Sequence, residues 1–237
     1  MHMAAWDSQP LLDARDIARR FGARWVLRGA SITVSPGQVV GLLGANGSGK
    51  STLLRVLATL LRPNAGTATI AGYDIMREPD SVRRNIGYLA HTPGLYDDLT
   101  ARENLIFAAA MLGRPDADSD ILGALERVAL GHVKDERVRG FSAGMQRRLA
   151  IARLSLSRPR LLLLDEPYSN LDTAGTSLMN SLITDTVNSG GAALVVLHEL
   201  APSAGIIDRL ATVHDGRITR GLDAAESEPR LALVGAD

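Results

Sequence analysis

The stretch Gly44-Ala45-Asn46-Gly47-Ser48-Gly49-Lys50-Ser51 decides which fold this chain is expected to adopt. It matches the pattern G-x-x-x-x-G-K-[ST] and lies between a short apolar run, 38–43, and a helical pattern that begins at Lys50. The glycines let consecutive backbone N–H groups point inward, and the helix adds the positive end of its dipole. A strand and a helix in these positions favour a phosphate-binding loop over a merely flexible glycine-rich turn.

The residues of this loop have different predicted roles in binding phosphate and Mg²⁺. The backbone cradles phosphate oxygens, Lys50 neutralises the β- and γ-phosphates, and Ser51 offers its hydroxyl to Mg²⁺. The predicted phosphate contacts are Gly44, Ala45, Asn46, Gly47, Ser48, Gly49, Lys50, Ser51 and Thr52.

A second run places two carboxylates side by side. Asp165 and Glu166 directly follow the apolar run 161–164, which is typical of a strand buried on both faces. Open α/β sheets bind ligands at this end of their strands. We expect Asp165 to hold Mg²⁺ through water and Glu166 to deprotonate the attacking water as general base. Solvated acids at an ordinary strand end are the alternative, which the phosphate loop upstream disfavours.

The composition bounds the class of protein. The 237 residues suit one large domain, or a core with one inserted subdomain. With 26 basic and 26 acidic side chains, the neutral chain is not expected to bind nucleic acid. The absence of cysteine excludes a disulfide scaffold, a thiolate metal site and a cysteine nucleophile. No apolar run reaches the roughly 18–20 residues that cross a bilayer, and no signal-peptide pattern is present, so we expect a cytoplasmic protein.

The order of predicted elements indicates a layered α/β fold. Aromatic content is only 4 %, which disfavours an all-β architecture. The expected strands are 11–21, 25–34, 38–43, 67–71, 86–89, 161–164, 192–197, 210–214 and 217–219. The expected helices are 50–61, 100–112, 118–130, one capped by Ser142 and one from Asp172 to Asn188. Antiparallel strands would thus precede a parallel sheet, which a helical block near 96–158 interrupts.

The run Phe141-Ser142-Ala143-Gly144-Met145 resembles Leu-Ser-Gly-Gly-Gln, the signature of ABC-type ATPases. These are the nucleotide-binding subunits of ATP-binding-cassette transporters. Ser142 and the following N–H groups start a helix and so form a second anion site, which in this family serves the ATP of the partner subunit. Ser142, Ala143 and Gly144 are therefore candidate nucleotide contacts, a plain capped helix being the alternative.

The resemblance covers residues 10–220 and implies a domain organisation. We expect a P-loop NTPase core with an antiparallel β subdomain and an inserted α-helical subdomain. One ATPase domain would span 10–222, its helical signature subdomain 96–158, and a variable tail 223–237.

Three further positions resemble functional elements of the family. Ser169-Asn170-Leu171-Asp172 resembles the D-loop, which crosses the dimer interface, although Asp172 also suits a simple N-cap. His198 follows the strand 192–197 and resembles the switch histidine, which contacts the γ-phosphate and Glu166. Phe21 resembles the aromatic that stacks on adenine; Trp25 competes for this role, and a buried core aromatic is the alternative.

One position departs from the family. Gln usually follows the strand that leads into the helical block, and here His91 takes its place after 86–89. Imidazole can accept from a metal-bound water, but it lacks the paired donor and acceptor of an amide. His91 is thus a candidate Mg²⁺ site residue, with contact to a partner subunit as the alternative.

Two sequence forms narrow the subfamily. His91-Thr92-Pro93-Gly94-Leu95-Tyr96 and the signature run extended to Arg148 are similar to the ATP-binding subunit of the haem exporter of cytochrome c maturation. Subunits of drug and polysaccharide exporters share most of the rest.

The resemblance implies a transport-coupled ATP hydrolase with ATP and Mg²⁺ as cofactors. Residues 44–52 of one subunit and 142–144 of the other would hold each ATP of a homodimer. Integral membrane permease subunits would hold this chain at the cytoplasmic face of the cell membrane and contact the cargo in its place. A soluble ABC ATPase for DNA repair or cluster assembly is an alternative. The neutral charge of the chain weighs against the DNA-repair version. A non-hydrolysing binding module is a third, which Lys50, Glu166 and His198 weigh against.

Overall fold

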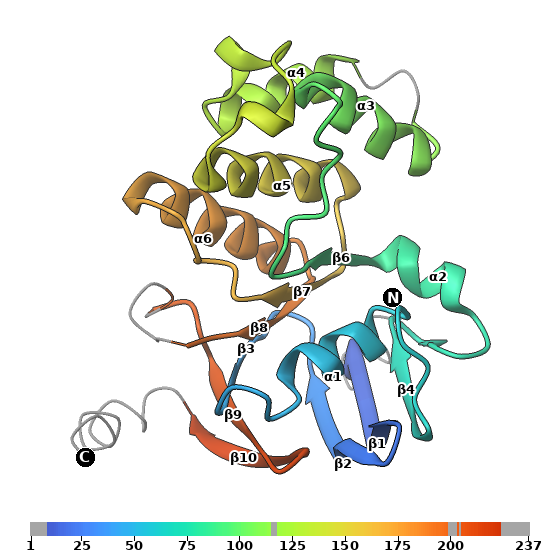
Figure 1. Cartoon of the computed structure of the whole chain (residues 1–237). Helices are drawn as coiled ribbons and strands as arrows, with labels where there is room; N and C mark the ends of the chain where they lie inside the picture. Colours follow the sequence, from blue (N-terminus) through green and yellow to red (C-terminus); the bar gives the residue numbers. More distant parts are fainter. Residues whose placement is uncertain (1–8, 115–117, 199–202, 204, 224–237) are drawn as a thin grey trace, which may run out of the picture.

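The computed structural model describes residues 9–114, 118–198, 203 and 205–223. Along this part of the chain, strands and helices form three layers (Figure 1). The strands are β1 Leu12–Phe21, β2 Arg24–Val34, β3 Val39–Leu43, β4 Ala65–Ile70, β5 Tyr73–Asp74, β6 Ile86–Leu89, β7 Leu161–Asp165, β8 Ala192–Val196, β9 Arg209–His214 and β10 Arg217–Asp223. The α-helices are α1 Lys50–Leu57, α2 Pro79–Asn85, α3 Ala101–Met111, α4 Asp118–Arg127, α5 Ala143–Ser157 and α6 Thr173–Asn188.

The central layer is a largely parallel sheet. In the described residues its strands follow the order β10-β9-β3-β8-β7-β6, and only β10 runs antiparallel to its neighbour. The carboxyl ends of β3, β6, β7 and β8 therefore meet at one edge. This edge gathers the phosphate loop, the His91 loop, the two carboxylates and His198.

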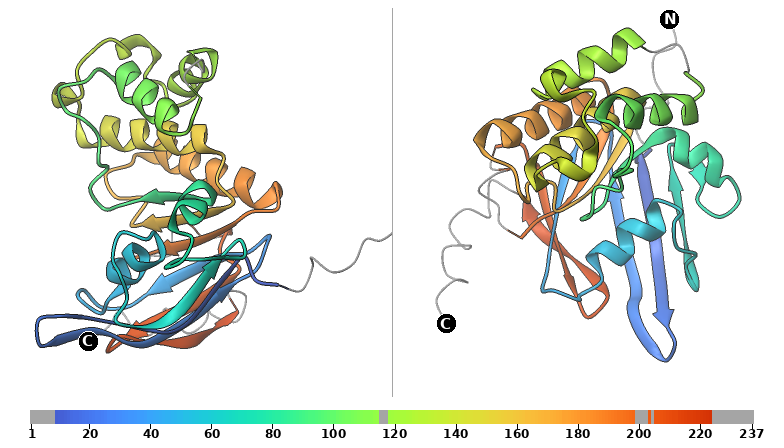
Figure 2. Two further views of the ribbon diagram at one scale, coloured as in Figure 1. Left: turned by 90° about the vertical axis from the view of Figure 1, so that its right-hand side faces the viewer. Right: turned by 45° about the horizontal axis from the view of Figure 1, so that its top comes forward.

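The second layer is an antiparallel sheet in the order β2-β1-β4-β5. It lies below α1 in Figure 1, and the β1–β2 hairpin projects beyond the rest of the molecule in Figure 2. The third layer consists of α3, α4, α5 and α6 on the other side of the parallel sheet.

Alternation along β7 divides the interior into two hydrophobic cores. Leu161 and Leu163 pack with α1 and the antiparallel sheet, whereas Leu162 and Leu164 pack with the helical layer. All of β7 is buried, as expected for a strand covered on both faces. The architecture confirms the predicted fold class of an α/β core with an antiparallel sheet and a helical block.

The structure corrects several element boundaries. The first helix ends at Leu57 rather than at 61, because Thr59 adopts a left-handed conformation with φ of 60°. The fourth strand spans Ala65–Ile70 and stops before Ala71, whose φ of 52° makes the turn. Likewise, α4 ends at Arg127 before Ala129, whose φ is 58°. The short α2 and β5 were not predicted. Most of the predicted tail 223–237 lies outside the described residues.

Candidate functional site

The phosphate loop joins β3 to α1 in a backbone path that requires glycine. Gly44, Gly47 and Gly49 have φ values of 146°, 75° and 113°. A Cβ on Gly44 would lie 2.4 Å from the carbonyl oxygen of Val213. Gly49 caps α1 without any side-chain hydrogen bond, so the first N–H groups of this helix stay available to an anion.

Lys50 lies buried under this loop. Its side chain is 5 % exposed, and its Nζ donates to the carbonyl oxygens of Gly44 at 2.5 Å and Ala45 at 3.0 Å. Burial lowers the pKa of Lys50, while Glu166 and Asp165 oppose the shift. Nearby, Ser48 Oγ is buried without a hydrogen-bond partner among the described residues. Because buried polar atoms are normally paired, the loop fits a phosphate ligand.

Ser51 and Asp165 form the candidate Mg²⁺ site. The Ser51 hydroxyl donates to Asp165 Oδ1 at 3.1 Å, across 114 residues of sequence. Burial raises the pKa of Asp165 and the hydroxyl of Ser51 lowers it, while the neighbouring Glu166 raises it further. The described residues contain no cluster of three or more His, Cys, Asp or Glu that could hold a metal alone. One carboxylate and one hydroxyl still fit Mg²⁺, which commonly binds few protein ligands together with phosphate and water oxygens.

Glu166 lies between two histidines. His198 Nε2 is 2.6 Å from Glu166 Oε1, and His91 Nδ1 is 3.2 Å from Glu166 Oε2. The sheet order explains this arrangement, because Glu166 follows β7 while the histidines follow its two neighbours, β8 and β6. The side chain of Glu166 is 20 % exposed, so a water molecule can reach the carboxylate. This geometry suits a general base whose orientation is fixed from both sides.

The N-terminus of α5 is an open end. Ser142 caps the helix, its Oγ accepting from the Met145 N–H at 3.2 Å, and both Ser142 and Ala143 are exposed. Gly144 is half-buried, and a Cβ on it would lie 3.1 Å from the carbonyl oxygen of Asn170. The N–H groups at this end therefore face outward, where a ligand or a second chain can reach them.

The predicted D-loop packs against this helix. Asp172 caps α6 by accepting from the Gly175 N–H at 2.8 Å, and it also accepts from Arg148 Nη2 at 2.7 and 2.8 Å. The Arg148 guanidinium and the Gly175 N–H lower the pKa of Asp172. The predicted N-cap is confirmed, and the same carboxylate joins α5 to α6.

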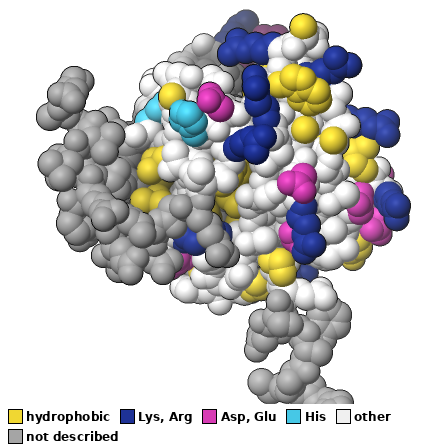
Figure 3. Space-filling view, turned by 90° about the horizontal axis from the view of Figure 1, so that it is seen from below, with side chains coloured by type: hydrophobic (Ala, Val, Ile, Leu, Met, Phe, Trp, Pro, Cys, Tyr) yellow, Lys and Arg dark blue, Asp and Glu magenta, His cyan; other side chains and the backbone are white. Residues whose placement is uncertain are grey.

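The β1–β2 hairpin separates the two aromatic candidates. Arg20 pairs with Trp25 across the strands, while Arg19 pairs with Leu27, and side chains alternate between faces. The Arg19 guanidinium lies 4.8 Å from the centre of the Phe21 ring, and its Nη1 donates to the carbonyl oxygen of Arg62, beyond the end of α1. Phe21 therefore lies on the α1 side and Trp25 on the opposite face with Arg20. Seen from below, Lys and Arg side chains are spread over the molecule among small hydrophobic groups (Figure 3).

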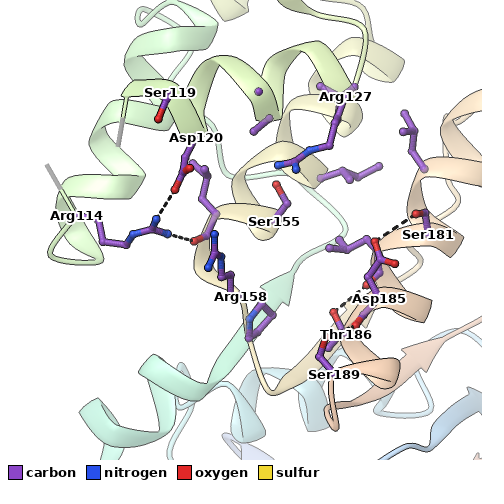
Figure 4. A pocket seen from close by; sticks show the side chains of 18 residues that line it. Arg114, Ser119, Asp120, Arg127, Ser155, Arg158, Ser181, Asp185, Thr186 and Ser189 are labelled. Carbon is purple, nitrogen blue, oxygen red and sulfur yellow. Dashed lines mark hydrogen bonds and ion pairs between the residues drawn. The ribbon is translucent and has the colours of Figure 1, made fainter. Parts of the chain in front are cut away.

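A separate cavity lies between the helices. It has a volume of about 570 Å³, and α4, α5 and α6 contribute most of its lining (Figure 4). Arg114 forms an ion pair with Asp120 on one side, and Ser181 donates to Asp185 on the other. None of the residues predicted to bind nucleotide lines this cavity.

Comparison with known proteins identifies the family. The family model described as "ABC transporter" matches residues 27–169. The chain belongs to the ABC transporter family. It is an ATP-binding subunit and an ATP hydrolase of the ABC type.

Two curated relatives indicate which ABC ATPases it resembles. It is 39 % identical over 203 residues to the cytochrome c biogenesis ATP-binding export protein CcmA 2 of Cupriavidus metallidurans, covering 85 % of this chain and 96 % of the relative. It is 37 % identical over 202 residues to the daunorubicin resistance ATP-binding protein DrrA3 of Streptomyces coeruleorubidus, covering 84 % and 64 %.

A solved structure agrees with the fold. An ATP-binding cassette, described as a dimer in a post-hydrolysis state bound to ADP and Pi, superimposes with a TM-score of 0.81 at 25 % identity. The match covers 90 % of this chain and 98 % of that one. In this ABC ATPase no described helix has the length and apolar character needed to cross a membrane.

The structure places most of the predicted site residues of this ABC ATPase together. Lys50, Ser51, Asp165, Glu166 and His198 meet at the carboxyl edge of the parallel sheet. His91 joins them through Glu166, a contact that the sequence did not predict. Ser142, Ala143 and Gly144 stand apart, at the open end of α5.

One residue of this edge was not singled out from the sequence. Arg147 is 2 % exposed and donates to backbone carbonyls beside Glu166 and His91. The sequence carried a signal for this burial, since Ala150, Ile151 and Leu154 lie three, four and seven positions after Arg147 and form an apolar stripe on its face of α5. An arginine on such a stripe is expected to be buried.

Proposed function

We propose that this chain is the ATP-hydrolysing subunit of an ABC exporter, and that the exporter carries haem for cytochrome c biogenesis. The observation that carries the hydrolytic part is Glu166, held between His198 and His91 one residue beyond the Ser51–Asp165 pair. The similarity to the cytochrome c biogenesis export protein and the His91-Thr92-Pro93-Gly94-Leu95-Tyr96 form support the choice of cargo.

The proposed roles follow from the geometry. The backbone N–H groups of 44–52 and Lys50 bind the phosphates, for which Lys50 exchanges its present carbonyl partners. Glu166 accepts the proton of the attacking water, and the imidazoles of His198 and His91 hold its two oxygens in place. Ser51 and Asp165 would hold Mg²⁺, which neutralises charge on the β- and γ-phosphates when bound. Phe21 stacks on adenine with one ring face, while Arg19 covers the other.

His91 receives a revised role in this proposal. Its imidazole contacts Glu166, so it orients the base rather than ligating Mg²⁺ directly. A neutral or charged imidazole can donate through Nδ1 in this position, which an amide at the same place could also do.

Each nucleotide-binding site would be completed by a second copy of the chain. The exposed end of α5, with Ser142, Ala143 and Gly144, supplies a second set of N–H groups to the γ-phosphate bound on the partner. Loss of that phosphate would remove the link and open the homodimer. Separate permease subunits would receive this motion through the helical block at the cytoplasmic face of the membrane.

The domain organisation remains part of the proposal. One ATPase domain spans 10–222, and the helical block 96–158 is inserted within it. The arrangement of the helical layer on one face of the parallel sheet supports this division.

A drug or polysaccharide exporter is the second candidate. The similarity to the daunorubicin resistance protein supports it, and the residues of the catalytic edge suit it equally well. Co-expression with the permease genes that neighbour this gene separates the two: haem-dependent stimulation of ATP hydrolysis supports the first, and drug-dependent stimulation the second. Failure to purify with any membrane subunit would favour a soluble ABC ATPase.

The hydrolytic assignment is tested by Glu166→Gln. The amide keeps the size of the side chain and removes the base, so kcat should fall roughly 10²- to 10⁴-fold while ATP binding persists. Steady-state phosphate release and titration with MgATP measure the two quantities. Hydrolysis by this variant at the wild-type rate would refute the assignment.

A further inference from the structure

The side chain of Arg147 is a buried cation without a carboxylate partner in an ion pair among the described residues. Arg147 is 2 % exposed, and it has the largest side chain among the described residues that are almost fully buried. It projects from α5, five residues after the Ser142 cap, which is about 7 Å along the helix axis. Burying a guanidinium costs free energy unless its N–H groups are well paired.

Within the described part of the chain, backbone carbonyls are the hydrogen-bond partners of Arg147. Its Nε donates to Pro167 O at 3.2 Å, and Nη1 to Ala90 O at 2.9 Å and His91 O at 3.3 Å. Its Nη2 donates to Asp165 O at 3.1 Å and also to Glu166 O. One side chain thus binds both the loop after β6 and the end of β7.

The peptide held in this way carries the proposed base. Glu166 has a φ of 51°, a left-handed conformation that is rare and costly for a residue with a side chain. Arg147 binds the carbonyls of the residues before, at and after this position. It also binds the backbone of His91, whose imidazole touches the other end of Glu166.

A comparison within α5 separates this arrangement from ordinary helix docking. Arg153 also binds loop carbonyls, with Nη1 on Gly94 O at 2.6 Å and Nη2 on Pro93 O at 2.7 Å. Within the described part of the chain, no hydrogen bond joins Arg153 to residues 165–167. Arg153 therefore attaches the loop to the helix, whereas Arg147 attaches the loop, the helix and the catalytic strand end to one another.

We propose that Arg147 is a positioning residue that sets the orientation of the Glu166 carboxylate and links it to the signature end of α5. This proposal rests on the proposed role of Glu166 as general base. A shift of α5, whose N-terminus is the proposed contact to the partner's nucleotide, would move the Glu166 peptide through this guanidinium. Hydrolysis would then depend on closure of the dimer.

Arg147→Met and Arg147→Lys test the proposal in the full-length chain. Methionine fills the space without N–H donors, and kcat should fall roughly 10- to 100-fold with KM for ATP changed less than about threefold, since misplacement of a catalytic group by 1 Å can cost about 100-fold. Lysine keeps the charge but not the planar fork, so kcat should recover in part. Arg153→Met is the matched control and should keep kcat within about threefold of the wild type.

A double variant shows whether Arg147 acts through Glu166. If it does, Arg147→Met should slow the Glu166→Gln protein less than about threefold, because the two effects are not additive within one unit. A further tenfold loss in that background would overturn the proposal. So would a wild-type kcat in a folded Arg147→Lys or Arg147→Met protein.

The outcomes also separate this proposal from the function on which it rests. Wild-type hydrolysis by Glu166→Gln alone would refute the general base, and with it a role for Arg147 through that base. A slow Glu166→Gln protein with a normal Arg147→Lys protein refutes only the positioning role. If Arg147→Met fails to fold, as judged by its melting temperature, Arg147→Lys decides: a lowered kcat at unchanged KM supports the proposal, and an unchanged kcat overturns it.

Discussion

Two helices of this molecule present their N-termini to anions in different ways. The end of α1 is enclosed by its own chain, with Gly49 as cap, Lys50 only 5 % exposed and Gly44 against the backbone of Val213. The end of α5 is capped by the side chain of Ser142, and its first residues are exposed. Both are helix N-termini with a positive dipole end, and among the described residues the first is the one surrounded by groups of the same chain that can complete a site.

The difference agrees with the proposed homodimer, in which the two helix ends have separate roles. The α1 site can bind phosphate within one chain, because loop, lysine and hydroxyl are already assembled. At the α5 end, the described residues show no such assembly of loop, lysine and hydroxyl, which supports the proposal that this end acts on a phosphate that another molecule brings. Substitutions at the two ends should therefore separate binding from dimer formation.

The largest effect is expected at the enclosed end. Lys50→Ala removes the cation beneath the loop. Because the loss of one partner of a buried charge pair is costly, ATP affinity should fall about 100-fold or more. ATP hydrolysis should fall to the background rate. Titration with MgATP and phosphate release measure this. Lys134, the other lysine of the sequence, is half-buried and pairs with Asp135 at 3.6 Å, away from the phosphate loop in sequence, so Lys134→Ala is the control. Wild-type ATP affinity of the Lys50 variant would contradict the phosphate-loop assignment.

A smaller effect is expected at the open end. Asp and Asn cap helices about as well as Ser, so Ser142→Asp and Ser142→Asn should both fold normally. Only Asp repels phosphate, and hydrolysis should fall roughly 10- to 100-fold in that variant, with ATP binding by the monomer retained. ATP-dependent dimerisation in a Glu166→Gln background, followed by size-exclusion chromatography, is the second measurement. Equal dimerisation of the two variants would show that this end does not face a phosphate.

The phosphate loop was predictable from the sequence, and the surroundings of Glu166 only in part. A phosphate loop is contiguous, so its residues and their spacing suffice to specify the site. Glu166 and its two histidines come from three strands that are distant in sequence, and only their order in the sheet brings them together. The contact of His91 with Glu166 depends on a loop path that spacing does not encode. The burial of Arg147, in contrast, follows from the apolar positions on its face of α5.

The fold shows the same limits. The long strands and the capped helices, such as α3 with its Thr100–Glu103 capping box, follow patterns that propensity and periodicity reveal. The helix α2 and the strand β5 are too short for either pattern. The helices α1 and α4 end earlier than predicted because Thr59 and Ala129 adopt left-handed conformations. Such conformations are uncommon for threonine and alanine, so the sequence did not indicate them.

A third prediction concerns the adenine side of the enclosed site. Phe21→Ala removes the ring on the α1 face, and KM for ATP should rise about tenfold, since stacking on one base contributes roughly 1–3 kcal/mol. Trp25→Ala, on the opposite face of the same hairpin, should leave KM unchanged. The reverse result would assign the stacking role to Trp25.

The smallest effect concerns the pair that holds the open end. Asp172→Asn retains the cap of α6 but loses the charge that pairs with Arg148. Because the pKa of Asp172 is lowered in the folded state, its stabilising effect is present above the unfolded pKa of about 3.9 and is lost as the pH falls through the folded value. The wild type should therefore melt a few degrees above the variant at pH 6, and the difference should shrink as the pH falls below the unfolded pKa of about 3.9. Asp98→Asn, at a looser surface pair with Arg139, is the control.

The alternation along β7 also affects which parts of the chain unfold locally. Since Leu161 and Leu163 belong to one core and Leu162 and Leu164 to the other, the amides of β7 can exchange with solvent only when both cores come apart. The helices of the third layer can unfold locally when only one of the two cores comes apart. Residues of β8 alternate between the same two cores, so hydrogen exchange should be slowest in β7 and β8, and the proposed catalytic carboxylates extend from one of the last segments to unfold.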